Sequence, residues 1–215
     1  MANFCTSWSG GKDACFALWQ AMNQGLTPTC LLTMLKGDRS SAHGLRRDVL
    51  EAQAHCLGLP IIFGQQSQGY ERGLKAALQQ VRDRFDTSQL LFGDIDLQAH
   101  RDWYEAILAN NGITTSFPLW HYPRKTLLTD MFAAGFETMI ISVKPDVLDQ
   151  RLLGEILTAG IAHEIASQGV CQTGEDGEFH TLVLDAPIFR HRLAVKIAGT
   201  TDDEWGYTQL DLIPA

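Results

Sequence analysis

Over roughly the first half of the chain, short apolar runs alternate with longer stretches in which apolar residues recur at helical spacing. The apolar runs contain neither glycine nor proline and predict buried strands at residues 4–8, 30–35, 61–63 and 89–92. Helical spacing predicts helices from Cys15 to Met22, from Leu45 to Cys56, from Tyr70 to Phe85, and through Trp103 and Ile107. This alternation predicts an α/β fold, in which a mostly parallel sheet has helices on both sides.

The second half has a less regular pattern. Residues 118–123 are apolar and aromatic between two prolines, which does not fit an ordinary helix. The remaining pattern predicts helices at 125–134 and 161–168 and strands at 139–143, 182–184, 193–197 and 207–213. We therefore predict a first domain over residues 1–114 and a smaller C-terminal α+β domain over residues 115–215.

Composition narrows the class of protein. The chain has 215 residues, of which 45% are hydrophobic and 20% charged, and this is enough to form a globular core. A net charge of −8 argues against a broad nucleic-acid surface. The five cysteines form no Cys-x-x-Cys pair, which favours buried reduced thiols. Met1-Ala2-Asn3 lacks the basic start of a signal peptide and no apolar run is long enough to span a membrane, so we expect a cytoplasmic protein without a membrane partner.

The loop Ser9-Gly10-Gly11-Lys12-Asp13 joins the first predicted strand to the first predicted helix. Glycines let a backbone approach a ligand closely, and a helix N-terminus carries partial positive charge. We therefore predict a phosphate-binding loop, with Lys12 as an accessible cation outside the core. A Walker A loop is excluded, because Thr6 and Asp13 stand where that motif needs Gly and Ser or Thr.

Further candidates follow the other predicted parallel strands, at the sheet edge where ligands of α/β proteins bind. His43 follows the second strand and is either an exposed loop histidine or a nucleotide contact. Gly93-Asp94-Ile95 follows the fourth strand, so Asp94 is a candidate for a metal or nucleotide contact. Asp96 is either a ligand or a helix N-cap.

The segment Gly174–Thr181 contains three carboxylates and two glycines beside a predicted strand. Three like charges so close together repel one another unless a metal, a cationic ligand or a basic side chain meets them. An acidic surface turn is the alternative interpretation.

Both loops resemble known signatures. The first resembles the Ser-Gly-Gly-x-Asp-Ser loop of PP-loop ATP pyrophosphatases, with Ala14 in place of the final Ser. Gly174-Glu175-x-Gly177-Glu178-Phe179-x-Thr181 resembles the signature of the diphthine–ammonia ligase family, a branch of those enzymes. Gly93-Asp94-Ile95, Pro118-Leu119-Trp120 and Gly135-Phe136 fall in matching order, so the similarity spans about residues 4–189. The stretch 93–101 and His180, where Glu is common, depart from the characterised branch and look like the bacterial-type members.

The resemblance implies a PP-loop/HUP-like, Rossmann-like ATP-binding domain over 1–114 and a substrate-binding domain over 115–215. It implies an ATP-dependent ligase that adenylates a carboxylate, releases AMP and pyrophosphate, and transfers ammonia to the acceptor. The acceptor, a small molecule or a modified protein side chain, stays open, as does assembly as a homodimer. A non-catalytic ATP- or AMP-binding sensor of the same fold is the alternative, favoured by Ala14.

The resemblance also implies roles for individual residues. The expected ATP-binding residues are Ser9, Gly10, Gly11, Lys12, Asp13, His43, Gly93, Asp94 and Ile95. The expected acceptor-binding residues are Trp120, Gly174, Glu175, Gly177, Glu178 and Thr181. The expected catalytic residues are Lys12, Asp13, Asp94, Glu175 and Glu178, with Mg²⁺ near Asp13 and Asp94. His100, Arg101 and Arg124 are secondary candidates for the α-phosphate.

Overall fold

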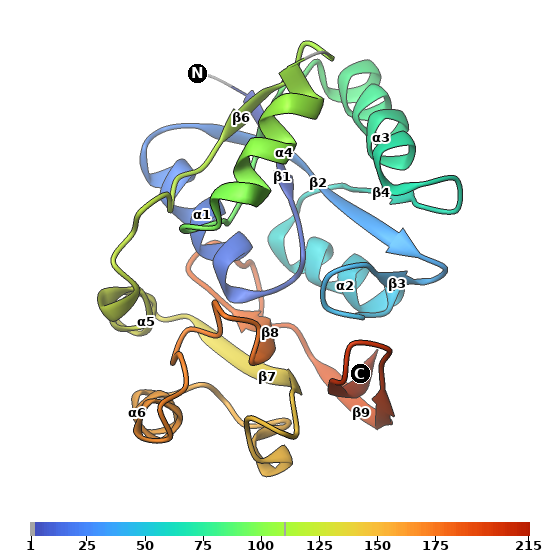
Figure 1. Ribbon diagram of the computed structural model, residues 1–215. Coiled ribbons are helices and arrows are strands. Elements are labelled where there is room, and N and C mark those ends of the chain that lie inside the picture. The colour runs from blue at the N-terminus through green and yellow to red at the C-terminus, as the bar shows by residue number, and fades with distance from the viewer. Residues whose placement is uncertain (1–2, 110) are drawn as a thin grey trace.

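Figure 1 shows a computed structural model that describes residues 3–109 and 111–215. Met1 and Ala2 at the start of the chain and Asn110, close to the predicted domain division, lie outside the described residues. Within the described residues, no helix is both long and apolar enough to cross a membrane.

A mostly parallel sheet forms the upper part of the molecule in Figure 1. Its parallel strands lie in the order β4-β2-β1-β5-β6, and the two-residue strand β3 pairs antiparallel with the end of β2. The strands are β1 (Asn3–Ser7), β2 (Thr27–Lys36), β3 (Arg39–Ser40), β4 (Ile61–Gln65), β5 (Gln89–Leu91) and β6 (Thr114–Ser116). The predicted parallel sheet is therefore confirmed.

Helices cover both faces of this sheet. Successive side chains of a strand point to opposite faces, so a continuous apolar strand has two apolar faces to bury. Leu31 and Leu35 of β2 join the core cluster formed with α1 and α2, whereas Leu32 and Met34 join the cluster formed with α3 and α4. These helices are α1 (Lys12–Asn23), α2 (Arg47–Leu57), α3 (Tyr70–Phe85) and α4 (Gln98–Ala109). The apolar runs were continuous because their strands are buried on both faces.

The second half forms a separate antiparallel sheet in the order β8-β7-β10-β9. Its strands are β7 (Glu137–Val143), β8 (Phe179–Asp185), β9 (Val195–Asp202) and β10 (Thr208–Pro214). The helices of this half are α5 (Arg124–Ala133), the short 3₁₀ helix η1 (Gln150–Leu152) and α6 (Ala159–Ser167). The predicted fold class, a helix-flanked parallel sheet followed by a smaller α+β part, is confirmed.

Helix α1 connects the two halves. Phe16 on α1 packs its ring against Tyr122 and Phe136, at centroid distances of 5.7 and 5.5 Å. The buried residues of α1 belong to one cluster with those of β7 and β8. The glycine loop before α1 is therefore held between both sheets.

Two short strands were not predicted from the sequence, and one of them lies at the predicted domain division. Strands β3 and β6 have too few residues, all of them polar, to give an alternating pattern. Strand β6 runs from Thr114 to Ser116, across the predicted division between 114 and 115, and that division stays a prediction. Helix α4 begins at Gln98, so Asp96 lies two residues before it.

Candidate functional site

The strand order of the parallel sheet reverses beside β1, whose neighbours β2 and β5 lie on opposite sides. In open α/β sheets such a reversal leaves a crevice at the carboxyl ends of the strands. A cleft of about 260 Å³ lies at this edge, between the loops that follow β1, β3 and β5. The sequence-predicted residues that line it are Ser9, Asp13, His43, Gly93, Asp94, His100 and Glu175.

The glycine loop has the geometry of a tight turn into a helix. Gly10 has a φ of +83°, a backbone conformation that residues other than glycine rarely adopt. Gly11 is the N-cap of α1, and a Cβ on it would lie 2.4 Å from Cε1 of His43. The loop therefore needs glycine at both positions, and α1 directs its N-terminal turn at the cleft.

A buried glutamine that the sequence analysis missed fixes this loop. Gln53 on α2 is fully buried and accepts a hydrogen bond from Nε1 of Trp8 at 2.8 Å. Its amide nitrogen donates to the carbonyl oxygens of Gly10 and Val183, at 3.0 and 2.8 Å. Gln53 lies four residues after Val49 and therefore on the apolar face of α2. A polar residue on that face was the sequence signal that could have indicated a buried hydrogen bond.

Lys12 differs from the prediction. It is only 4% exposed, so it is not an accessible loop cation. Its Nζ donates to both carboxylate oxygens of Asp13, at 2.9 and 2.7 Å, and to Oε1 of Glu175 at 3.3 Å. Burial alone would lower the pKa of Lys12, but the charges of Asp13 and Glu175 outweigh it and the pKa is raised. The lysine is buried because the acidic loop of the second half covers it.

Glu175 is the carboxylate whose titration the site changes most clearly. Burial, followed by the charge of Asp13, raises the pKa of Glu175 to about 7, although Lys12 opposes the shift. The carboxyl group therefore exchanges its proton close to neutral pH, which is the range that acid–base chemistry requires.

The loop after β5 packs directly on the glycine loop. A Cβ on Gly93 would lie 2.6 Å from the backbone nitrogen of Ala14 and 2.7 Å from the carbonyl carbon of Asp13. This close approach brings the Asp94 carboxylate to the same cleft as Asp13. Asp94 Oδ1 lies 2.7 Å from Nδ1 of His100, and this hydrogen bond raises the pKa of His100.

Arg124 joins the Asp94 loop to the acidic loop. Its guanidinium donates to both carboxylate oxygens of Asp96, each at 2.7 Å, and to Asp176 at 3.2 Å. The helix-cap interpretation of Asp96 is therefore replaced by a bidentate pair with Arg124, which holds the pKa of Asp96 below its usual range. This pair keeps the acidic loop in place over the cleft.

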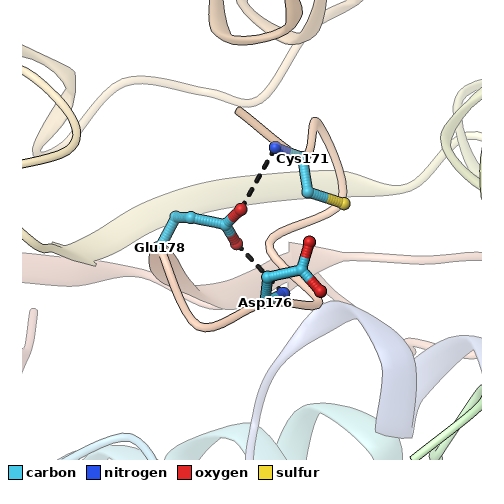
Figure 2. Close-up of side chains that lie close together, drawn as sticks. All are labelled: Cys171, Asp176 and Glu178. Carbon is cyan, nitrogen blue, oxygen red and sulfur yellow. Dashed lines mark hydrogen bonds between the residues drawn. The ribbon is translucent and has the colours of Figure 1, made fainter. Parts of the chain in front are cut away.

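Glu178, unlike Glu175, points into its own loop (Figure 2). Its two carboxylate oxygens accept the backbone N–H groups of Cys171 and Asp176, each at 3.1 Å. Cys171, Asp176 and Glu178 have the spacing of a three-ligand metal site. Glu178 already accepts two hydrogen bonds and Arg124 already supplies a positive charge there, so this cluster is better explained as a loop anchor.

We expect Glu178→Gln to destabilise the acidic loop. A carboxylate can accept from two N–H groups, whereas an amide offers one acceptor oxygen and repels one N–H, with a cost of about 1–3 kcal/mol. Thermal unfolding should show this loss, and Asp176→Asn should show a smaller one because its side chain is exposed. Equal stability of Glu178→Gln and wild type would contradict the anchor assignment.

The remaining sequence-predicted residues lie around the cleft or away from it. Thr181 Oγ1 accepts the backbone N–H of Lys12 at 3.2 Å, at the start of α1. Gly174 and Gly177 have φ values of +73° and +78° and form the turns of the acidic loop. Ile95 is a buried core side chain, and Trp120 packs under the Arg101 guanidinium at 4.6 Å; neither lines the cleft.

Comparison with protein families finds a match for each half of the chain. Residues 3–115 match the family model for the diphthamide synthase N-terminal domain, and residues 123–212 match that for the diphthamide synthase C-terminal domain. The chain belongs to the diphthamide synthase family.

Curated relatives of this family are similar over most of the chain. A diphthine–ammonia ligase of Danio rerio is 24% identical over 89% of this chain and 86% of its own length. One of Mus musculus is 25% identical over 87% of this chain and 80% of its own length. One of Schizosaccharomyces pombe is 26% identical over 87% of this chain, but the chain covers only 35% of that protein.

Proposed function

We propose that the protein is an ATP-dependent ligase of the diphthine–ammonia ligase type. It would adenylate a carboxylate of its acceptor, release pyrophosphate, and replace AMP with ammonia to form an amide. The observation that carries this proposal is the cleft at the sheet edge, where the glycine loop, Asp94 and Glu175 meet. The names of the curated relatives support the same chemistry.

The glycine loop is proposed to bind the phosphates of ATP. Gly11 has no side chain to cap α1, and Thr181 accepts only the N–H of Lys12, so the next N–H groups of the first helical turn can donate to an anion. The cleft is also lined by the half-buried ring of Tyr70, which can contact a base, and by the edges of the buried Trp8 and Phe92 rings. Nucleotide binding would require Lys12 to exchange part of its contact with Asp13 or Glu175 for phosphate.

Asp13 and Asp94 are the proposed Mg²⁺ ligands. Both carboxylates line the cleft, and one or two carboxylates together with phosphate oxygens form the ligand set that Mg²⁺ usually takes. The bound cation would neutralise negative charge on the phosphates.

Glu175 is the proposed proton acceptor for ammonia. Ammonium has no lone pair, so it must lose a proton before its nitrogen attacks the acyl carbon and AMP leaves. A carboxylate whose pKa lies at about 7 attracts the cation when ionised and accepts its proton when the nucleophile forms. Glu175 is therefore assigned to the acceptor side of the site, and Glu178 to supporting the loop.

The alternative is a nucleotide-binding sensor without turnover. Ala14, at the position of the usual serine, packs against Gly93 and leaves no hydroxyl for phosphate or metal there. A sensor does not need a carboxylate that titrates near neutral pH, so Glu175 favours the enzyme.

The experiment that tests the proposal uses α-labelled ATP with Mg²⁺, ammonium and candidate carboxylates, including diphthine-bearing protein. We expect labelled AMP and pyrophosphate, because the acceptor oxygen attacks the α-phosphorus and the α–β bridge breaks. Tight ATP binding with no AMP formed in the presence of any acceptor would support the sensor. ADP and phosphate as the sole products would overturn the proposed chemistry. Glu175→Gln should keep ATP affinity and lose amide formation.

A further inference from the structure

A second hollow of about 630 Å³ adjoins the nucleotide cleft. It lies between the β2–β3 hairpin and the β9–β10 hairpin, and it is also lined by Lys144, directly after β7, and by His180 of β8. The segment Ser40–Ala42 lines both the hollow and the cleft, so the two are neighbours across that segment. A ligand in the hollow would therefore lie beside a nucleotide in the cleft.

Most charged groups of the hollow are already paired. Lys36 pairs with Glu204, and Arg39 pairs with Asp211 at 2.7 Å. Asp203 Oδ1 accepts the backbone N–H groups of Trp205 and Tyr207, at 2.8 and 2.9 Å. Lys36 thus neutralises Glu204, whereas the Asp203 carboxylate is held by backbone N–H groups and has no ion pair among the described residues.

Lys144 is the cation that stays unpaired. It is half-buried at the end of β7, and its Nζ lies 5.0 Å from the ring centroid of Tyr207. Within residues 3–109 and 111–215, no carboxylate forms an ion pair with it. The backbone N–H of Lys144 donates to the carbonyl of Glu178 at 3.0 Å, so the side chain starts directly beside the acidic loop.

His180 connects Lys144 to the nucleotide site. Its ring stacks on His43, at a centroid distance of 4.6 Å, and contacts the Tyr207 ring in a tilted arrangement at 4.8 Å. Burial first, and then the nearby charges of Lys12 and Lys144, lower the pKa of His180 to about 4, although Asp203 opposes the shift. A neutral ring therefore stands between the buried ammonium of the nucleotide loop and the free ammonium of the hollow.

The hollow also offers aromatic surface. Trp205 is 72% exposed and lines it, together with the Tyr207 ring. A large aromatic side chain left in water at the mouth of a hollow is a typical contact for the flat or apolar part of a ligand.

We propose that Lys144 binds the reacting carboxylate of the acceptor in this hollow, while Tyr207 and Trp205 contact the acceptor's body. This inference rests on the proposed ligase function and assigns its acceptor subsite. Lys144 donates hydrogen bonds and transfers no proton. The amide product carries no charge, so its affinity for this position falls when the reaction is complete.

The test uses two probes of equal shape, 3-phenylpropionate and 3-phenylpropionamide, titrated into the ¹⁵N-labelled protein at pH 7. We expect saturable shifts of the Gly177, His180 and Tyr207 amide signals with the carboxylate. The amide should bind about ten-fold more weakly or worse, since hydrogen bonds to a charged partner are the stronger kind. Lys144→Gln should remove this preference, and Lys144→Arg should retain it.

Two further variants keep the result interpretable. Lys36→Gln, in the same hollow but at a lysine paired with Glu204, should keep the preference for the carboxylate. His180→Glu would place a negative charge beside Lys144 and should abolish carboxylate binding, whereas His180→Gln should not. ATP affinity measured in parallel should be unchanged in Lys144→Gln.

Equal affinity for acid and amide, no saturable carboxylate binding, or an unchanged preference in Lys144→Gln would overturn the assignment of Lys144. AMP formation that does not depend on Lys144 would overturn it while leaving the ligase proposal standing. If the carboxylate bound at Lys144 but the protein never formed AMP, the carboxylate site would stand and the ligase proposal would be overturned.

Discussion

Lys12→Met is expected to abolish AMP formation and to weaken ATP binding by about one to two decades, the range for losing a charge-assisted hydrogen bond. Methionine keeps the length of the stem and removes the ammonium. Asp13 and Glu175 would then face each other across the cleft without the cation that both now contact. Two uncompensated carboxylates repel a triphosphate, so we expect the loss of ATP affinity at the upper end of that range.

The same substitution should make stability depend more strongly on pH. Glu175 has a raised pKa in the folded protein, so its ionisation costs stability as pH rises from its unfolded value toward about 7. Without Lys12 the folded pKa rises further, and the cost extends to higher pH. We expect Lys12→Met to unfold at a lower temperature than wild type by a margin that grows between pH 6 and 8, with a loss of about 1–3 kcal/mol at the upper end.

Lys75→Met is the matched control. Lys75 pairs with Glu71 one turn away on the exposed face of α3, and such surface pairs contribute about 0.3–0.5 kcal/mol. Its ATP affinity and its pH profile should match wild type. If Lys12→Met kept both the ATP affinity and the pH profile of wild type, the buried cluster would have no role in nucleotide binding.

The fold was predictable because its signals are local. The parallel strands β1, β2, β4 and β5 are apolar runs, and the helices of the first half are apolar stripes, so both signals depend on residues only a few positions apart. The parallel strand β6 is polar and gave no such signal. The tertiary role of Gln53 was not predictable in this way. A polar residue on an apolar helix face indicates a buried hydrogen bond, but its partners Gly10 and Val183 lie 43 and 130 residues away in sequence.

The two loops of the candidate site could be predicted from the sequence, but the contacts between residues far apart in the chain could not. Both loops were identified from their glycines and acids, and Asp13, His43, Asp94 and Glu175 are among the predicted residues that line one cleft. The burial of Lys12 depends on Glu175, which is 163 residues further along the chain. Glu175 and Glu178 look equivalent in sequence, and only the turns of the loop direct one to Lys12 and the other to backbone N–H groups.

Gly93→Ala is expected to have the second large effect, because it acts on the contact between the two loops that form the cleft. The added Cβ would lie 2.6 Å from the backbone nitrogen of Ala14 and 2.9 Å from its Cα. A backbone cannot rotate away as a flexible side chain can, so the Asp94 loop must move outward from the glycine loop. Inserting a methyl group into a packed contact costs about 1–3 kcal/mol.

The displacement should harm function more than stability. A shift on the order of 1 Å in a positioning group can lower turnover about 100-fold, and Asp94 would move with its loop. We therefore expect a folded Gly93→Ala protein with little AMP formation and weaker Mg²⁺-dependent ATP binding. Gly199→Ala is the matched control, because no described atom lies within 4 Å of its added Cβ and its φ is not positive. If Gly93→Ala formed AMP as fast as Gly199→Ala, the contact between the loops would not position the proposed metal ligand.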